Sequence, residues 1–282
     1  MVTAYWLALH FVLGRTIVLD VETGSLEIEL EAELSGKAFR DLWICSRRDG
    51  DQAETENRPA IPVGCPTRTH FFSDGAIPIA TPVIPLGSNL KITSSPNLVR
   101  IDVEHVPEQY RGTDAGRLEG GALILTGDAL DAFGTLPLNG KVTLGALFSE
   151  TDRLSTITGR YQIRGWTPWG LLDWDMRVLR EGDLLAGART RFVSGQGDTA
   201  TGQIVVTLPD PATPLMRVTA ISDHSLSNLG IQYYFTDEVI VRPSPIEALI
   251  LDPFVQLALT FFGAIAGYGW LKNLSNGNEP PG

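Results

Sequence analysis

One stretch near the C-terminal end constrains this chain more than any other feature. Residues 254–271 are eighteen consecutive positions without a charged side chain. As a helix they would be about 27 Å long, close to the hydrocarbon thickness of a bilayer. Their polar residues are few, chiefly Gln256 and Thr260, so they lack the polar stripe of a helix on a protein surface. The stretch predicts a transmembrane helix.

The residues within this stretch add detail to the prediction. Pro253 stands just inside the start, where the missing N–H costs no hydrogen bond. Gly263 and Gly267 form a GxxxG motif, which permits close approach of a second helix. Apolar spans are rich in glycine and alanine in any case, so this motif alone has little specificity. We expect these two glycines to be helix-packing residues.

The end of the stretch has the composition of a membrane interface. Tyr268 and Trp270 lie beside Lys272, as an aromatic belt followed by a basic stop would. Glu247 and Asp252 precede the stretch, so the positive-inside tendency places the C-terminus in the cytoplasm. The rest of the chain is then expected on the outer side of a bacterial-type inner membrane, in the periplasm.

The chain also starts with an uncharged run. Residues 1–14 precede Arg15 and are too few for an ordinary span. Three readings are open: a short or tilted anchor, an atypical export signal, and a buried helix of the soluble domain. The run lacks the basic region and the small-residue cleavage site of a secretory signal, so we expect an anchor.

Charge and cysteine content exclude some classes of protein and favour others. The net charge of −11 argues against nucleic-acid binding, which needs a basic surface to neutralise phosphates. Cys45 and Cys65 are not spaced as a C-x-x-C motif. We expect them to form a disulfide in an oxidising compartment; the alternative is two unpaired thiols, one of them buried.

Residues 16 to about 245 have the pattern of a β protein. In residues 25–34 the even positions from 26 are apolar and the odd positions from 27 are glutamates, which predicts a half-buried antiparallel strand. A row of glutamates of this kind can bind cations or a basic partner, but it is more often a plain solvated face. Asn139-Gly140, between two apolar runs, predicts a hairpin turn.

The predicted fold class is mainly β, with antiparallel sandwich-like or jelly-roll-like ectodomains, a short N-terminal hydrophobic helix and a C-terminal transmembrane helix. A polar, glycine-rich segment at 106–121 is the expected boundary between two β domains. The predicted organisation is an anchor (1–15), two β-sandwich-like domains (16–107 and 108–246), a transmembrane helix (247–272) and a disordered cytoplasmic tail (273–282).

No motif in the chain specifies a reaction. The sequence has no G-x-S-x-G, no H-E-x-x-H and no dinucleotide-binding fingerprint. None of its four histidines makes a metal-ligand pair with a nearby histidine or cysteine; they are His10, His70, His105 and His224. We therefore expect no catalytic residue, no metal and no cofactor.

The one anomaly of composition is a tryptophan cluster. Trp166, Trp169 and Trp174 lie within nine residues and make up half of the chain's tryptophans. They can pack in the core, anchor a protein partner, lie at a membrane surface or stack on sugar rings. We keep them as candidate contacts to a partner or ligand.

These features predict a non-catalytic, membrane-anchored accessory or assembly subunit of a larger membrane complex, for which photosynthetic and respiratory complexes are natural hosts. Its expected partners are the lipid bilayer and other membrane-protein subunits. The alternative is an envelope-anchored module that binds a carbohydrate or another ligand through residues 166–174. An enzyme whose site is assembled from distant loops is the third possibility.

Overall fold

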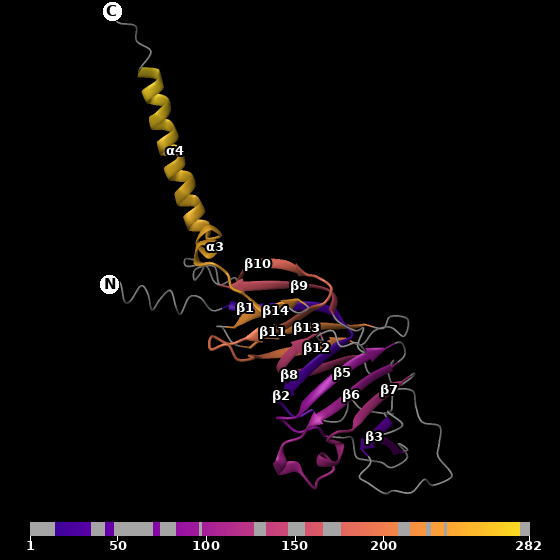
Figure 1. Ribbon diagram of the computed structural model, residues 1–282. Coiled ribbons are helices and arrows are strands. Elements are labelled where there is room, and N and C mark those ends of the chain that lie inside the picture. The colour runs from indigo at the N-terminus through magenta and orange to yellow at the C-terminus, as the bar shows by residue number, and fades with distance from the viewer. Residues whose placement is uncertain are drawn as a thin grey trace, which may run out of the picture. The chain divides into compact units, whose positions relative to one another are not determined.

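The protein is mainly β, with antiparallel strands followed by a C-terminal helix (Figure 1). The computed structural model describes residues 15–34, 43–47, 70–73, 83–95, 98–126, 134–145, 156–165, 176–207, 215–223, 227–233 and 236–276. The strands in this part of the chain are β1 (Arg15–Thr23), β2 (Ser25–Leu30), β3 (Trp43–Arg47), β4 (His70–Ser73), β5 (Asn89–Ser95), β6 (Leu98–His105), β7 (Ala122–Thr126), β8 (Thr135–Leu144), β9 (Thr156–Gly165), β10 (Arg177–Leu184), β11 (Ala188–Val193), β12 (Thr201–Thr207), β13 (Met216–Ser222), β14 (Asn228–Tyr233) and β15 (Val239–Val241). The helices are η2 (Glu108–Tyr110), η3 (Gly116–Leu118), α3 (Pro245–Ile250) and α4 (Pro253–Asn276). The mainly β, antiparallel part of the predicted fold class is confirmed.

Hydrogen-bonded neighbours in the sheet follow the order β10-β9-β1-β13-β12-β8-β2-β5-β6-β7-β3-β4. Strand β11 pairs with β8 and β14, and β14 also pairs with β15. Strands β2, β5, β6 and β7 lie side by side in Figure 1. Many neighbours are far apart in sequence; for example, β1 pairs with β13 and β2 pairs with β8.

Alternation of apolar and polar residues builds the core. In β5 and β6 every second residue is buried, including Leu90, Ile92 and Ile101. Strand β2 buries Leu26, Ile28 and Leu30 and turns its glutamates outward, as predicted. The strand ends at Leu30, four residues earlier than the pattern predicts, and Ala32 is exposed.

The predicted hairpin at Asn139-Gly140 is wrong, because both residues lie inside the ten-residue strand β8. The first part of β8 pairs with β12, and the last part pairs with β2. Gly140 belongs to both parts and stands opposite Leu30 in β2 and Gly202 in β12. A Cβ atom at Gly140 would collide with the carbonyl oxygen of Glu29. The glycine therefore serves close strand packing here and not a turn.

The described residues fall into two compact units. One contains those of 16–162 and 181–242, and the other contains Arg15 and those of 163–180 and 243–282. The segment 106–121, the expected domain boundary, lies within the first unit. It buries Val106 and Leu118, and the backbone N–H of Gly121 donates to the carbonyl oxygen of Leu118 at 2.9 Å.

A helix covers most of the predicted span: α4 begins at Pro253 and ends at Asn276. Nevertheless, the described residues include no helix with both the length and the apolar character needed to cross a membrane. The structure thus does not support the transmembrane part of the prediction. The predicted N-terminal anchor at residues 1–14 lies outside the described residues, as does the end of the predicted tail, 277–282.

Candidate functional site

Two regions stand out as candidate sites: the helical segment α3–α4 and a groove on the β-rich unit. Helix α3 begins with a capping arrangement in which two side chains replace missing helix hydrogen bonds. The backbone N–H of Ser244 donates to Oε2 of Glu247 at 2.8 Å, and the N–H of Ile246 donates to Oγ of Ser244 at 3.2 Å. Reciprocal capping of this kind defines a helix start sharply. The local sequence thus starts α3 at Pro245.

Helix α4 begins three residues after the last residue of α3, and it has a cap of its own. Asp252 is fully buried, and its Oδ1 accepts the backbone N–H of Val255 at 3.4 Å. The side-chain amide of Gln256 donates from Nε2 to the carbonyl oxygen of Ile250 at 3.0 Å. Side chains at the start of α4 therefore bond both its own N-terminus and the last turn of α3. These contacts hold the junction between the two helices.

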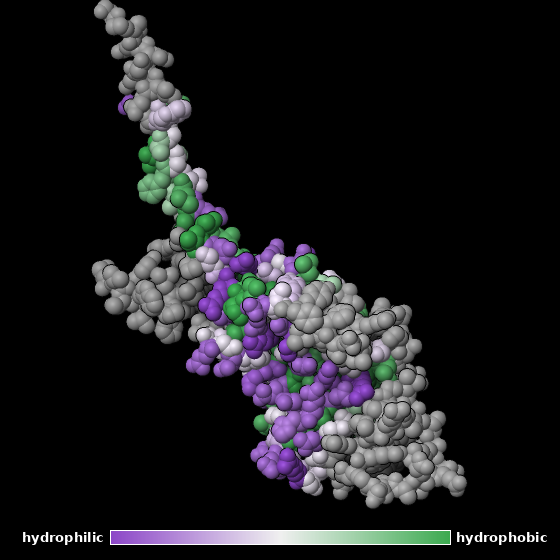
Figure 2. Space-filling view, in the orientation of Figure 1, coloured by the Kyte–Doolittle hydropathy of each residue, from purple (hydrophilic) through white to green (hydrophobic). Residues whose placement is uncertain are grey.

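Apolar side chains cover much of α4, and hydrophobic residues are visible on the face of the helix in Figure 2. Eight large hydrophobic side chains of this helix are more than half exposed: Leu257, Leu259, Phe261, Phe262, Ile265, Tyr268, Trp270 and Leu271. A helix on the surface of a soluble domain buries one apolar face and exposes a polar one, and α4 does not have this distribution. It presents an unusual amount of apolar surface.

The predicted helix-packing glycines lie on the same side of α4 as its two polar residues. At 3.6 residues per turn, Gln256, Thr260, Gly263 and Gly267 fall on one face. The Thr260 hydroxyl donates to the carbonyl oxygen of Gln256 at 2.7 Å. A Cβ atom at Gly263 or Gly267 would have no described neighbour within 4 Å. The face is open, and its role in helix packing stays a prediction.

The predicted interface residues come together near the end of α4. Tyr268 is 71% exposed and Trp270 is 66% exposed, and Lys272 follows within the same turn. The structure thus places two aromatic residues and one basic residue within about one turn at one end of an apolar helix, with Trp270 on the other side of the helix from Tyr268. Their contact with a membrane stays a prediction.

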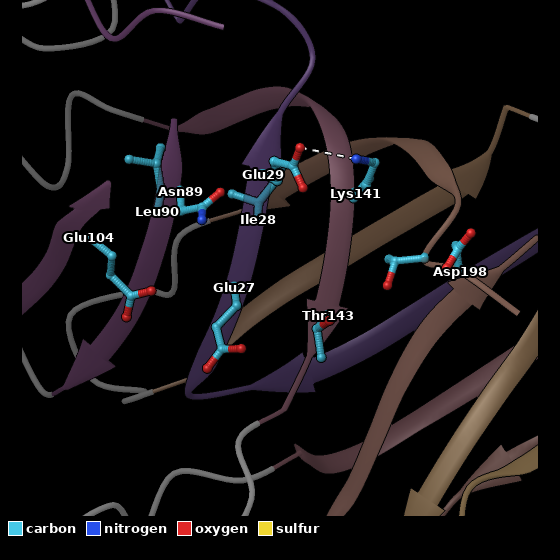
Figure 3. A pocket seen from close by; sticks show the side chains of 10 residues that line it. Glu27, Ile28, Glu29, Asn89, Leu90, Glu104, Lys141, Thr143 and Asp198 are labelled. Carbon is cyan, nitrogen blue, oxygen red and sulfur yellow. Dashed lines mark hydrogen bonds and ion pairs between the residues drawn. The ribbon is translucent and has the colours of Figure 1, made fainter. Parts of the chain in front are cut away.

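The second region is a groove of about 580 Å³ on the outer side of β2, β5 and β8 (Figure 3). Polar and charged groups dominate it; Ile28 and Leu90 also line it, although both residues are almost fully buried. Its charged residues are Glu27, Glu29, Glu104, Lys141 and Asp198. They come from four different segments of the chain, and sequence spacing does not bring them together.

Ion pairs neutralise part of this acidic surface. Lys141 Nζ lies 3.0 Å from Glu29 Oε1, and Arg189 Nη2 lies 3.5 Å from Glu27 Oε2. In the strand register Lys91 stands between Glu27 and Asp102. Glu27 thus belongs to a cross-strand row of alternating charges, and Glu29 stands opposite Lys141; pairs of this kind stabilise sheets.

Glu104 is the carboxylate in the groove with the most perturbed environment. Partial burial raises its pKa, the negative charge of Glu27 raises it further, and Lys91 opposes this shift. A raised pKa is one requirement for a general acid, but neither a histidine nor a cysteine is among the residues that line the groove with Glu104. The groove has the composition of an ion-paired sheet surface.

A bidentate ion pair lies beside this groove. Arg191 donates from Nε and Nη2 to the two carboxylate oxygens of Glu238, both at 2.7 Å, and from Nη1 to the groove residue Thr199 at 2.9 Å. Hydrogen bonding to Arg191 lowers the pKa of Glu238. The carboxylate lies so close to Gly230 that a Cβ atom there would collide with it. This pair ties the loop before β15 to β11.

The other predicted sites fall partly outside the described residues. Cys45 is disulfide-bonded and fully buried, while its predicted partner Cys65 lies outside them. The tryptophan cluster at 166–175 lies outside them as well, so its contacts stay a prediction. Of the four histidines, which we expect not to bind metal, His105 contacts Glu119, with 3.2 Å between Nδ1 and Oε1.

The described part of the chain contains no group of three or more histidine, cysteine, aspartate or glutamate residues able to hold a metal ion. Comparisons with protein-family models, with curated proteins and with solved structures found no match to this chain. Function must therefore be argued from the α3–α4 segment and the β-rich unit themselves.

Proposed function

We propose that this protein is a non-catalytic accessory or assembly subunit of a larger membrane protein complex. Helix α4 attaches it to the membrane and packs against partner helices, and the β-rich unit, with sandwich-like ectodomains, covers the complex from outside. The observation that carries this proposal is the exposure of eight large hydrophobic side chains along α4.

The energy available from covering α4 is large. Full burial of an exposed side chain of this size stabilises by about 1.5–3 kcal/mol; because these eight are roughly two-thirds exposed, covering them offers about 8–15 kcal/mol. A water-soluble protein gains nothing by leaving such a surface exposed, whereas lipid and apolar partner helices cover it on all sides. The hydrogen bonds of Thr260 and Gln256 to backbone carbonyl oxygens suit these surroundings, because a polar group without a partner is costly there.

The disulfide at Cys45 supports a location outside the cytosol. Disulfides persist in the periplasm and other oxidising compartments, and are rare where thiols are kept reduced. With Lys272 at the far end of α4, the proposed orientation has the β-rich unit in the periplasm of a bacterial-type cell and the C-terminus toward the cytoplasm.

The test is purification of the full chain from membranes in a mild detergent. We expect it to remain with the membrane fraction at high salt and to co-purify with other membrane subunits in fixed stoichiometry. The double variant Phe262→Glu, Ile265→Glu should leave the membrane fraction. Val239→Glu, a change at an exposed valine of the β-rich unit, is the matched control and should behave as the wild type. A wild-type chain recovered without detergent as a monomer would contradict the proposal.

A further inference from the structure

We propose that the outer face of α3 rests in the boundary between lipid headgroups and acyl chains, with Ile246 and Ile250 as the inserted side chains. This inference depends on the proposed membrane attachment through α4, and it adds a second, shallower contact. It assigns the α3–α4 junction to the membrane surface.

The first argument is the direction in which the junction's side chains point. Its acidic groups are bonded to the protein backbone: Asp252 is fully buried at the start of α4, and Glu247, which is partly exposed, caps the start of α3. Its large apolar groups are turned outward, since Ile246 is 66% exposed and Ile250 is 54% exposed. A connector built for water has the opposite arrangement.

The second argument is geometric. Ile246 and Ile250 are four residues apart on a helix, so they lie on the same face, one turn above the other. The six residues of α3 are about 9 Å long, which suits a contact along a membrane surface and not an insertion across it. Side chains of Ser244, Glu247 and Gln256 form hydrogen bonds with backbone groups at the two ends of α3. Fewer backbone N–H and C=O groups would therefore enter lipid without a partner.

The third argument concerns the choice between lipid and a protein partner. The sequence of α3 contains no basic residue, and its only charged side chain, Glu247, is already bonded to the backbone of Ser244. A face of two isoleucines without charged or hydrogen-bonding groups offers little specificity to a protein partner, whereas the acyl-chain boundary requires none. Because the chain has a net charge of −11, zwitterionic lipid fits it better than anionic lipid.

The experiment places a nitroxide spin label at single introduced cysteines in the full chain, reconstituted into phosphatidylcholine vesicles under non-reducing conditions. The labelled variants are Ile246→Cys and Ile250→Cys on the proposed face, and Phe262→Cys within α4. Leu185→Cys is the matched control, because Leu185 is also 66% exposed but belongs to a turn of the β-rich unit. Accessibility to a water-soluble nickel chelate and to oxygen is measured with and without vesicles.

We expect the labels at 246 and 250 to lose accessibility to nickel and gain accessibility to oxygen when vesicles are present, while the label at 185 does not change. If the label at 262 enters lipid but those at 246 and 250 stay in water, this inference is wrong and the attachment through α4 stands. If the chain does not float with vesicles and the label at 262 stays in water, the proposed function fails as well. Protection of positions 246 and 250 only on addition of a protein subunit would assign the face to a protein partner and overturn the lipid contact.

Discussion

Replacement of Gly140 by alanine tests the sheet packing at the point where β8 changes partners. The added methyl group would point into the buried side of β8, against the carbonyl oxygen of Glu29 and 3.1 Å from Cγ1 of Ile28. A carbonyl oxygen inside a strand ladder cannot rotate away as a side chain can. Relief of the collision therefore requires β2 and β8 to separate, which weakens the hydrogen bonds between them.

The expected loss follows from opposing contributions. Extra atoms in a well-packed core destabilise by about 1–3 kcal/mol. Alanine reduces the freedom of the unfolded chain relative to glycine, which offsets about 0.4–1 kcal/mol of that loss. Because backbone opposes the methyl group, we expect a net destabilisation of about 2 kcal/mol. This lowers the urea midpoint by about 1 M at an ordinary slope of about 2 kcal/mol per M.

The assay is urea unfolding of the full chain in a mild detergent, followed by circular dichroism. Gly195→Ala is the matched control, since Gly195 is exposed, has no atom within 4 Å of the added methyl group and lies outside the left-handed region. Its midpoint should equal or slightly exceed that of the wild type. Equal midpoints for Gly140→Ala and Gly195→Ala would refute the close approach of β2 and β8.

Three further predictions concern charge and the disulfide. Glu238→Gln should destabilise by about 1–2 kcal/mol at neutral pH because it breaks the bidentate pair with Arg191. The folded state lowers the pKa of Glu238 from its ordinary 4.5, so this contribution is present above pH 4.5 and is lost as the pH falls; a difference that persists at pH 2 would contradict the ion-pair account. Glu104→Gln should have the opposite effect. The folded state raises the pKa of Glu104, so the stability of the wild type falls as the pH rises through 4.5 and the folded pKa; the variant should be slightly more stable than the wild type at pH 7 and equal to it in acid. Lower stability of the variant at pH 7 would show that the charge of Glu104 is favourable. Reduction of the disulfide at Cys45 should cost about 2–4 kcal/mol, measured as a lower urea midpoint with dithiothreitol, and an unchanged midpoint would mean that the crosslink does not stabilise the fold.

Local patterns in the sequence were informative where a residue's environment follows from its immediate neighbours. The alternation at Leu26, Ile28 and Leu30 predicted a half-buried strand because side chains alternate along any strand. The same rule failed at Ala32, because contacts distant in sequence decide where a strand stops: the N–H of Glu31 donates to Asn139 and the carbonyl oxygen of Leu30 accepts from Gly87. Asn139-Gly140 failed for a related reason. A local turn preference was overridden by the three strands that meet at this glycine.

In the candidate groove, contacts between residues distant in sequence matter even more than local patterns. Glu27 and Glu29 were visible in the sequence as a row of carboxylates, and a solvated face was the expected reading. Their partners Arg189 and Lys141 are more than one hundred positions away. Only strand register brings these residues together. The alternating pattern of polar residues within a strand does not specify which other strand lies next to it.

The sequence by itself determined the class of secondary structure and the apolar character of residues 254–271, since each depends on residues within one or two turns. The tertiary structure decided the order of the strands, the role of Gly140 and the pairing of the groove's charges. It also showed that acidic groups bond to the backbone and isoleucines turn outward at the junction of α3 and α4. The physical reason is that propensity, periodicity and capping are short-range, whereas sheet register and burial are set by atoms that only folding brings into contact.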